Sequence, residues 1–445
     1  MTRTVEIPIW LLATLCLFAG AAFASHFFLP SVRWLLRRWT ESLVTRLNSR
    51  LARPIRPFEA ARRKDAIARL VHDPRVASAI AEHAAATGLR EDVAFEMAGR
   101  YAREIVPAFS AILYFAVAAR LARLISTAIY RVRVIGRGQA FARIDATATI
   151  VFVMNHRSNM DYVLVTWLAA GRTSISYAVG EWARRWPLRP LIRGMGGFFV
   201  RRRDLNPLYR RVLARYVQTA TAAGVSQAIF PEGRLSRDGA LAEPKLGILS
   251  YVVDAHVEGI GRDVVFVPVA IAYDRVLEDR RLVTPGGEAT RFRLSLLQVM
   301  VYVLQHLRLR LFGRYRGFGR AVVVFGDPLS LSDHRANGHV DPTATLGKAL
   351  MDRIAAAMPA LPVPIVARAL MRGASHRADL AAAMRACGSA LEAVVVGRAD
   401  PEALAEEAVE MLAVRGIVRR DGDRVVPADE GRSLLAYYAA SAPER

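Results

Sequence analysis

The chain has 445 residues, enough for one large or two ordinary domains with a sizeable core. Hydrophobic residues make up 53% of it and the mean hydropathy is positive, so contact with a membrane is expected. The net charge of +22 is carried mostly by arginine and favours anionic lipid, while the lack of any nucleic-acid-binding pattern predicts no nucleic acid partner. Two cysteines, Cys16 and Cys387, exclude a disulfide framework and a cysteine-based metal site.

An apolar segment from Ile7 to Leu29 begins the chain and exceeds the ~20 residues needed to span a hydrocarbon core. Seven arginines follow it between residues 33 and 56. By the positive-inside rule, the rest of the chain lies on the cytoplasmic side of an inner membrane. A cleaved signal peptide is the alternative, because Ala22-Phe23-Ala24 resembles a cleavage site, although the amino-terminal flank is not basic overall. We expect residues 1–57 to form an uncleaved anchor with a basic juxtamembrane helix.

Residues 58–130 have a helical pattern of acidic, basic and alanine-rich turns. Within it, Ile105 to Ala119 is almost wholly apolar, and Arg120 and Arg123 follow at helical spacing. Fifteen residues are few for a membrane span, so we predict a core helix or a helix on the membrane surface.

Short apolar runs alternate with helical stretches in residues 131–333. The predicted strands are Val132–Ile135, Ile150–Val153, Ser174–Val179, Phe198–Arg201, Gln227–Phe230, Val264–Ile271 and Ala321–Phe325. The main predicted helices between them are Tyr162–Ala170, Leu208–Ala223 and Gly247–Val257. This alternation predicts an α/β domain.

Two further helical regions complete the pattern. Leu294 to Arg316 is an amphipathic arginine-rich helix that either lies on an anionic bilayer or packs on the sheet of its own domain. Residues 334–445 are mostly helical, with two short strands around an Asp-Gly turn in Ile417–Val426 and a last helix through Tyr437 and Tyr438.

A polar cluster, Asn155-His156-Arg157-Ser158-Asn159-Met160-Asp161, directly follows the apolar run Ile150–Met154. Such a cluster at the carboxyl end of a buried strand lies where open α/β sheets place ligands. If a helix begins after Ser158, the Asp161 carboxylate can fold back onto the His156 imidazole. One ring nitrogen is then fixed by the carboxylate, and the other can take a proton from a hydroxyl.

Three later clusters are candidate binding elements. Residues 194–203 place glycines and two aromatic residues before three arginines, whose guanidinium groups match phosphate oxygens. Residues 230–239 end another strand with Glu232, which can accept hydrogen bonds from substrate hydroxyls, and with Arg234 and Arg237, which can meet phosphate. Pro268 lies inside a strand-like run and indicates an edge or a bulge beside a site.

Taken in order, these clusters resemble the four blocks of the glycerolipid acyltransferase family, H-x4-D, G-x-x-F-I-x-R, F-P-E-G and a V/I-P strand. They stand here as His156 to Asp161, Gly196 to Arg201, Phe230 to Gly233, and Val267-Pro268. Within the family the likeness is greatest to glycerol-3-phosphate and dihydroxyacetone-phosphate acyltransferases, on His156-Arg157-Ser158 with Asp161-Tyr162 and on Pro244-Lys245-Leu246-Gly247. The resemblance implies a mixed sheet flanked by helices, with a catalytic domain over residues 131–333.

The resemblance also implies a reaction, transfer of an acyl group from acyl-CoA or acyl carrier protein to the sn-1 hydroxyl of glycerol 3-phosphate. His156 is then the base and Asp161 its partner, with no cofactor or metal required. Arg201 and Glu232 bind the glycerol phosphate. The weaker candidates for substrate contacts are Arg157, Gly197, Phe199, Gly233, Arg237 and Pro268.

Two other functions fit part of the pattern. The acceptor can instead be lysophosphatidic acid, because Pro231 and Asp238-Gly239 also occur in the enzymes that use it. A catalytically silent membrane protein that binds anionic lipid would also carry many arginines. The presence of both His156 and Asp161 argues against that second alternative.

Overall fold

The computed structural model describes two compact units, Met1–Ile55 and Arg56–Arg445, each considered by itself. The described residues are 42, 45, 48, 49, 51, 53–60, 63–170, 172–180, 184, 188–201, 205–257, 261–284, 318–337, 341–395 and 400–443. The predicted anchor segment Ile7–Leu29 and the predicted helix Leu294–Arg316 therefore lie outside the described residues.

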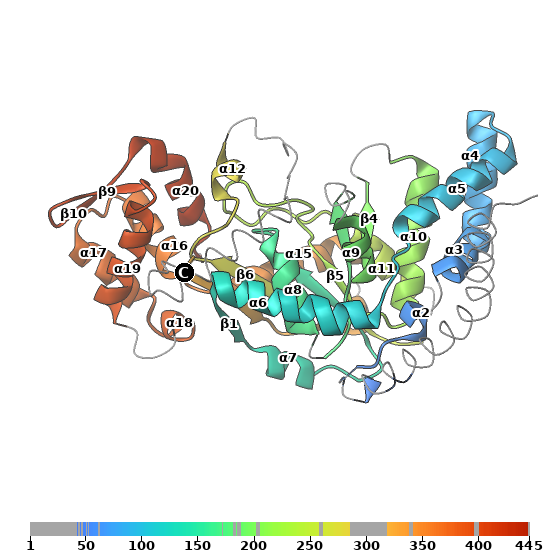
Figure 1. Cartoon of the computed structure of the whole chain (residues 1–445), viewed down its shortest axis with the longest axis horizontal. Helices are drawn as coiled ribbons and strands as arrows, with labels where there is room; N and C mark the ends of the chain where they lie inside the picture. Colours follow the sequence, from blue (N-terminus) through green and yellow to red (C-terminus); the bar gives the residue numbers. More distant parts are fainter. Residues whose placement is uncertain are drawn as a thin grey trace, which may run out of the picture. The chain divides into compact units, whose positions relative to one another are not determined.

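An eight-stranded mixed sheet forms the centre of the second unit (Figure 1). Its strands are β1 (Arg131–Ile135), β2 (Thr149–Met154), β3 (Ser176–Gly180), β4 (Gly197–Val200), β5 (Gln227–Ile229), β6 (Val264–Tyr273), β7 (Arg320–Phe325) and β8 (Leu329–Ser330). The order is β1-β7-β6-β2-β5-β3-β4, with β8 paired to β6. From β6 to β4 all neighbours are parallel, and β7 and β8 run antiparallel to β6. All seven predicted strands are confirmed, and the described residues add to this sheet only the two-residue β8.

The described helices of this unit pack on the two faces of this sheet or on one another. They are α2 (Pro57–Ala60), α3 (Arg63–Val71), α4 (Pro74–Thr87), α5 (Glu91–Ile105), η1 (Ile112–Ala118), α6 (Ala119–Ile129), α7 (Arg137–Ala142), α8 (Met160–Ala169), α9 (Leu188–Gly194), α10 (Pro207–Ala222), α11 (Gly247–Val257), α12 (Asp279–Val283), α14 (Leu331–Ala336), α15 (Pro342–Ala357), α16 (Pro362–Met371), α17 (Arg377–Ala386), α18 (Gly388–Glu392), α19 (Pro401–Ala413), η3 (Asp429–Gly431) and α20 (Arg432–Ala440). The predicted carboxyl-terminal hairpin is present as β9 (Val418–Asp421) and β10 (Arg424–Pro427).

An Asp-Pro or Asn-Pro pair begins four of the described helices. These pairs are Asp73-Pro74 in α4, Asn206-Pro207 in α10, Asp341-Pro342 in α15 and Asp400-Pro401 in α19. In each, the carboxylate or amide oxygen accepts a hydrogen bond from a backbone N–H of the first turn, and the proline needs no such partner. The sequence alone therefore determines where these helices begin.

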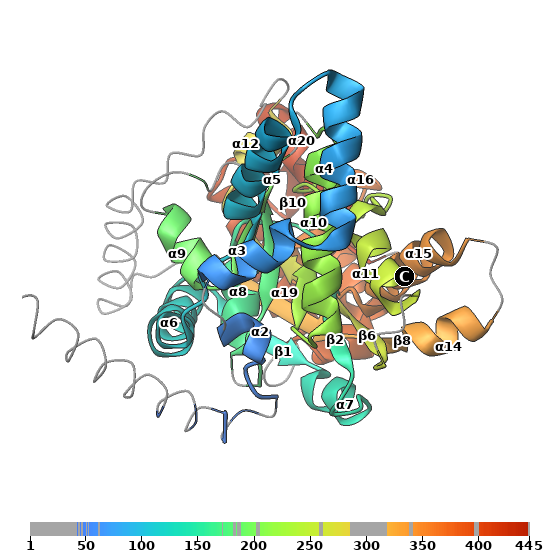
Figure 2. The same ribbon diagram turned by 90° about the vertical axis from the view of Figure 1, so that its right-hand side faces the viewer.

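Strand β2 divides the two hydrophobic cores of the unit. Ile150, Phe152 and Met154 face the core built with α8 and the carboxyl-terminal helices α16 to α20, whereas Val151 and Val153 face the opposite core. That second core includes α3, α4, α5, α10, α11 and α15 (Figure 2). Because both faces are covered, every residue of β2 is buried.

The apolar stretch predicted as one helix over Ile105–Ala119 is divided by a break around Pro107. Helix α5 ends at Ile105, and a continuous η1–α6 helix then runs from Ile112 to Ile129. Of the described helices, this one alone is long and apolar enough to cross a membrane, with about a third of that stretch buried. Pro342–Ala357 and Pro362–Met371 pass the same test only together, and they are bent by 95°.

Pro268 was expected at an edge or a bulge, and it lies at a bulge of the interior strand β6, opposite Val153 of β2. Residues 267–268 of β6 face residues 326–328 between β7 and β8, so the partner segment has one extra residue here. The Pro268 carbonyl accepts a hydrogen bond from Gly326 N (2.8 Å), in the gap between β7 and β8. A residue's N–H and C=O face the same side of a strand, so the N–H that proline lacks would face this gap. The interruption between β7 and β8 therefore accommodates the proline without an edge strand.

Candidate active site

Asn155 directly follows β2, and its side chain continues the pairing of that strand to β6. Its amide oxygen accepts a hydrogen bond from Ile271 N (2.7 Å), and its amide nitrogen donates to Ile271 O (2.9 Å). The backbone is thereby released from the sheet at residue 156, where the catalytic loop, residues 155–161, turns into α8. This role of Asn155 was not predicted from the sequence, because its partner Ile271 is 116 residues away.

His156 and Asp161 meet as the sequence predicted. The distance from His156 Nδ1 to Asp161 Oδ2 is 2.9 Å, and both side chains are buried. Asp161 Oδ2 also accepts hydrogen bonds from the backbone N–H groups of Arg157 (2.8 Å) and Ser158 (3.0 Å). These hydrogen bonds fix the position of the carboxylate in the first turn of α8. The carboxylate binds Nδ1, so Nε2 is the ring atom left to accept a proton.

The other carboxylate oxygen of Asp161 accepts a hydrogen bond from a residue of the neighbouring strand β6. Tyr273, the last residue of β6, donates its hydroxyl to Asp161 Oδ1 at 2.6 Å. Burial and the charge of Asp161 raise the pKa of Tyr273 well above its usual value, so this hydroxyl remains a donor. The imidazole of His156 stacks on Phe230 with ring centroids 4.1 Å apart and meets the Tyr162 ring edge-on at 5.3 Å. The imidazole is therefore fixed by a carboxylate and two aromatic rings.

The side chain of Glu232 is hydrogen-bonded to the backbone of His156. Its Oε1 accepts a hydrogen bond from His156 N (2.9 Å) and its Oε2 accepts one from Ala242 N (3.4 Å). Burial raises the pKa of Glu232, and the charge of Arg157 opposes that shift. The neighbouring Gly233 has φ +69°, and a Cβ there would lie 2.9 Å from Lys245 Cδ. In this structure Glu232 thus supports the catalytic loop, and Gly233 permits the turn.

Arg157 points into the protein and Arg237 is exposed. The Arg157 guanidinium donates to Ser236 Oγ (3.2 Å), to Ala240 O (3.1 Å) and to Gly239 O. It therefore connects the catalytic loop to residues 236–240. Arg237 lies on the exposed side of this second loop.

Arg201 follows β4 and is paired with a carboxylate that the sequence analysis did not predict. Glu104 of α5 accepts two hydrogen bonds from Arg201, Nε to Oε1 at 3.0 Å and Nη2 to Oε2 at 2.7 Å. Arg184 also contacts Glu104 Oε1 at 3.0 Å. The hydrogen bonds that Arg201 donates to Glu104 raise the pKa of Arg201, whose guanidinium also lies over the rings of Tyr101 and Tyr209.

Arg201 and His156 both follow the carboxyl ends of parallel strands, β4 and β2, which are separated in the sheet by β5 and β3. Three strand spacings place the axes of these two strands about 14 Å apart. Arg202 and Arg203 lie outside the described residues.

Gly197 and Phe199 pack inside the domain. A Cβ on Gly197 would lie 2.5 Å from Ile192 Cγ2, so a larger residue would displace α9 from β4. Phe199 is fully buried, with the guanidinium of Arg193 5.6 Å from its ring centroid. Their observed contacts shape the sheet end that carries Arg201.

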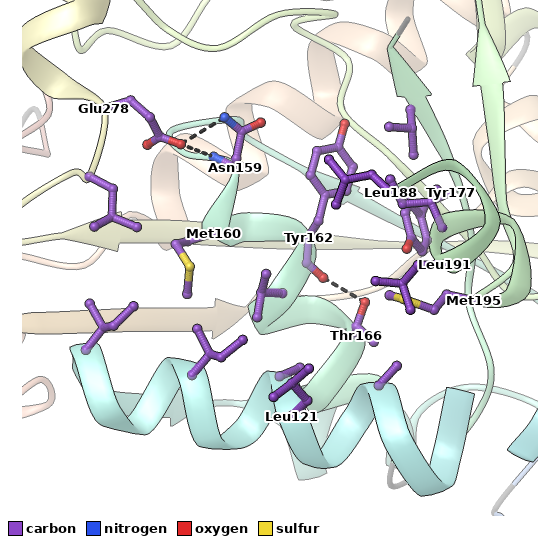
Figure 3. A pocket seen from close by; sticks show the side chains of 18 of the residues that line it. Leu121, Asn159, Met160, Tyr162, Thr166, Tyr177, Leu188, Leu191, Met195 and Glu278 are labelled. Carbon is purple, nitrogen blue, oxygen red and sulfur yellow. Dashed lines mark hydrogen bonds between the residues drawn. The ribbon is translucent and has the colours of Figure 1, made fainter. Parts of the chain in front are cut away.

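An apolar cavity of about 670 Å³ lies beside the catalytic loop (Figure 3). Helices η1–α6, α8 and α9, strand β3 and the segment after β6 form its wall. Asn159, Met160 and Tyr162 of the loop and α8 also line it, and Tyr162 contacts the His156 ring. Its volume is in the range of ligand pockets, and its mostly aliphatic wall suits a hydrocarbon chain.

Glu278 lines the same cavity and accepts hydrogen bonds from two residues of the catalytic loop. Its Oε2 accepts a hydrogen bond from Ser158 Oγ (2.7 Å), and its Oε1 accepts two from Asn159, at N (3.0 Å) and Nδ2 (2.8 Å) (Figure 3). Burial raises the pKa of Glu278. Sequence reasoning missed both Glu278 and Tyr273, although both follow the V-P strand closely. Within the described ranges, no group of three His, Cys, Asp or Glu residues is placed to hold a metal ion.

Part of the chain that carries this geometry is similar to known acyltransferases. Residues 133–272 match the family model described as Acyltransferase. A glycerol-3-phosphate acyltransferase of Aeromonas hydrophila subsp. hydrophila is 36% identical over 194 residues, which are 43% of this chain and only 23% of that protein. The crystal structure of the 1-acyl-sn-glycerophosphate (LPA) acyltransferase PlsC from Thermotoga maritima is 18% identical, with a TM-score of 0.35 over 54% of this chain and 76% of that one. A likeness this low supports no further conclusion.

Proposed function

We propose that residues 133–272, which match the Acyltransferase model, form the catalytic domain of an enzyme that acylates the sn-1 hydroxyl of glycerol 3-phosphate. The acyl donor is a thioester, acyl-CoA or acyl carrier protein. The product is lysophosphatidic acid, and its formation is the first step of phospholipid synthesis. The observation that carries the proposal is the buried His156–Asp161 pair, one aromatic side chain away from an apolar cavity.

In the proposed reaction, His156 Nε2 removes the proton from the sn-1 hydroxyl as its oxygen attacks the thioester carbonyl. A C–O bond forms, the C–S bond breaks, and the leaving thiolate takes the proton back from the imidazolium. Asp161 stabilises the imidazolium and holds the ring in one tautomer. Since the thioester is already activated, no acyl-enzyme, metal or further cofactor is required.

The apolar cavity is our proposed site for the acyl chain. Aliphatic side chains of α6 and α9 face it, including Ala122, Ile125 and Leu191. Transfer of a chain from water to such a surface contributes roughly 0.8 kcal/mol per buried CH₂ group. A chain held there would end near Tyr162, beside the imidazole.

The acceptor phosphate is assigned to Arg201, because its guanidinium lies at the carboxyl edge of the sheet. Glu104 uses the Nε and one Nη2 hydrogen, so the Nη1 hydrogens of the same group are not engaged by that pair. With Arg184 beside it, Arg201 presents positive charge to a dianion.

Association with a membrane is also part of the proposal. On the η1–α6 helix, Val117, Leu121 and Leu124 are 49%, 48% and 52% exposed, and Val117 and Leu121 also line the cavity. Arg120 and Arg123 are exposed next to them and suit anionic headgroups. A lipid chain could then pass from the bilayer into the cavity. The inner membrane, with the catalytic domain on its cytoplasmic side, is the location that we propose.

An assay of thioester cleavage with purified protein tests the proposal. Free thiol release from palmitoyl-CoA should depend on added glycerol 3-phosphate and should yield lysophosphatidic acid. Release that depends on lysophosphatidic acid instead would establish the alternative acceptor. No release with either acceptor, from acyl-CoA or from acyl carrier protein, would favour a silent lipid-binding protein.

A further inference from the structure

The segment from Tyr273 to Asp279, between β6 and α12, contacts the catalytic loop on one side and the carboxyl-terminal helices on the other. Toward the catalytic loop, Tyr273 bonds Asp161, and Glu278 bonds Ser158 and Asn159. The segment is therefore bonded to three residues of the catalytic loop, Ser158, Asn159 and Asp161, and Asp161 in turn positions His156.

The side chains of Asp274 and Asp279 in the same segment make contacts that lead to the carboxyl-terminal helices. Asp274 Oδ2 accepts hydrogen bonds from Arg320 N (2.8 Å) and Nη1 (3.1 Å), and Arg320 Nη2 reaches Glu407 of α19 at 2.6 Å. Asp279 pairs with Arg415 at 2.5 Å and accepts a hydrogen bond from the hydroxyl of Tyr438 on α20.

Tyr438 is the centre of this second set of contacts. Its buried hydroxyl donates to Asp279 Oδ2 and accepts from Val276 N (3.2 Å) and Arg415 Nη1 (3.1 Å). The hydroxyl therefore fixes both the backbone of the segment and the side chain next to Glu278. Consecutive Cα atoms are 3.8 Å apart, so a displacement of Asp279 is passed directly to Glu278.

We propose that Tyr273 and Glu278 are positioning residues for the catalytic pair, and that docking of Tyr438 on Asp279 holds Glu278 in place. The inference rests on the proposed function for its effect on turnover, but the mechanical coupling does not depend on it. A shift of about 1 Å in a reacting group can cost on the order of 10²-fold in rate. The carboxyl-terminal helices thus belong to the catalytic unit.

Adjacent tyrosines on α20 supply a matched pair of variants. Tyr438→Phe removes a hydroxyl with three protein contacts, whereas Tyr437→Phe removes a buried hydroxyl without a hydrogen-bond partner among the described residues. We expect Tyr438→Phe to lower kcat at least about tenfold, with both KM values within about threefold of wild type. Tyr437→Phe should be close to wild type. Equal kcat values for the two variants would overturn the proposal.

Two substitutions of Glu278 distinguish the effect of its hydrogen bonds from the effect of its negative charge. In Glu278→Gln the amide oxygen can still accept from Asn159, and the amide nitrogen can donate to Ser158 Oγ. We expect Glu278→Ala to lower kcat as Tyr438→Phe does and Glu278→Gln to restore it to within about threefold. A loss that appears in the KM values alone, or no loss in Glu278→Ala, would contradict a positioning role.

Hydrogen exchange of the loop provides a readout that does not require activity. The amides of residues 157–159 are bonded to Asp161 and Glu278, so peptides covering residues 155–161 should exchange faster in Tyr438→Phe and Glu278→Ala than in Tyr437→Phe. Unchanged exchange would refute the coupling even in an inactive protein. If exchange responds but the wild type transfers no acyl group, the proposed function fails and the coupling stands.

Discussion

Arg201 and Glu104 form a two-bond pair, Nε to Oε1 at 3.0 Å and Nη2 to Oε2 at 2.7 Å, although 97 residues separate them in the chain. The pair holds the guanidinium in a fixed plane at the edge of the sheet, and Glu104 keeps Arg184 as a second partner. Any anion that binds Arg201 must therefore use its remaining N–H groups or replace Glu104. Either route depends on the shape of a guanidinium.

Arg201→Lys should raise the KM for glycerol 3-phosphate by at least about tenfold, equivalent to ~1.4 kcal/mol, while the KM for the acyl donor changes little. An ammonium cannot reproduce two parallel hydrogen bonds to a phosphate. Steady-state kinetics with each substrate varied in turn measures the effect. Arg210→Lys, at an exposed position on α10, is the control. A change confined to the donor KM would assign Arg201 to the donor site.

Ala122→Phe should reduce activity with long acyl donors more than with short ones. Ala122 lines the cavity, whereas Ala119 is buried on the same helix and does not line it. Both substitutions overpack their surroundings, at about 1–3 kcal/mol of stability. Only Ala122→Phe should change the ratio of kcat/KM between palmitoyl and octanoyl donors. The same ratio in both variants would place the acyl chain elsewhere.

The η1–α6 helix should be labelled by a photoreactive lipid probe confined to vesicles of anionic phospholipid. The exposed Leu121 and Leu124 would meet acyl chains in such vesicles. In the double variant Leu121→Glu and Leu124→Glu, labelling of peptides from residues 112–129 should fall several-fold. Leu89→Glu changes another exposed leucine and should leave the labelling unaltered. Equal labelling of that helix in all three proteins would refute its membrane contact.

Glu232→Gln should gain stability relative to wild type as pH rises. Burial raises the pKa of Glu232, so between the unfolded value, about 4.3, and the raised value, the folded state keeps a proton that the unfolded state has lost. The free energy of unfolding of the wild type therefore falls with pH across this interval, and glutamine lacks this titration. Urea unfolding at about pH 4 and about pH 7 measures the difference. A relative stability that is flat or falls with pH would contradict the burial argument.

Local sequence patterns predicted the strands and the His156–Asp161 contact, because both depend on short-range rules. Alternation of apolar runs identifies buried strands, and a spacing of five residues lets a carboxylate at a helix start reach back to an imidazole. The rule that a proline inside a strand marks an edge or a bulge also held for Pro268. The rule could not tell which of the two applies, and the gap between β7 and β8 supplies the bulge in the interior of the sheet.

The residues missed by sequence reasoning all act across long separations. Tyr273 meets Asp161 and Glu278 meets Asn159 only because β6 lies beside β2, and Glu104 meets Arg201 only because α5 packs on β4. No local periodicity encodes these contacts. These contacts can be explained once the structure is known, because each buried carboxylate requires hydrogen-bond partners.

The transfer rate of His156→Ala tests the central claim most directly. Purified wild type and variant are compared for acyl transfer from a thioester to glycerol 3-phosphate, with His72→Ala, an exposed histidine, as the control and a melting curve for each. If His156 is the base, kcat should fall by roughly 10²–10⁴ in His156→Ala while the protein remains folded. A folded His156→Ala protein that turns over at nearly the wild-type rate would contradict the proposed mechanism.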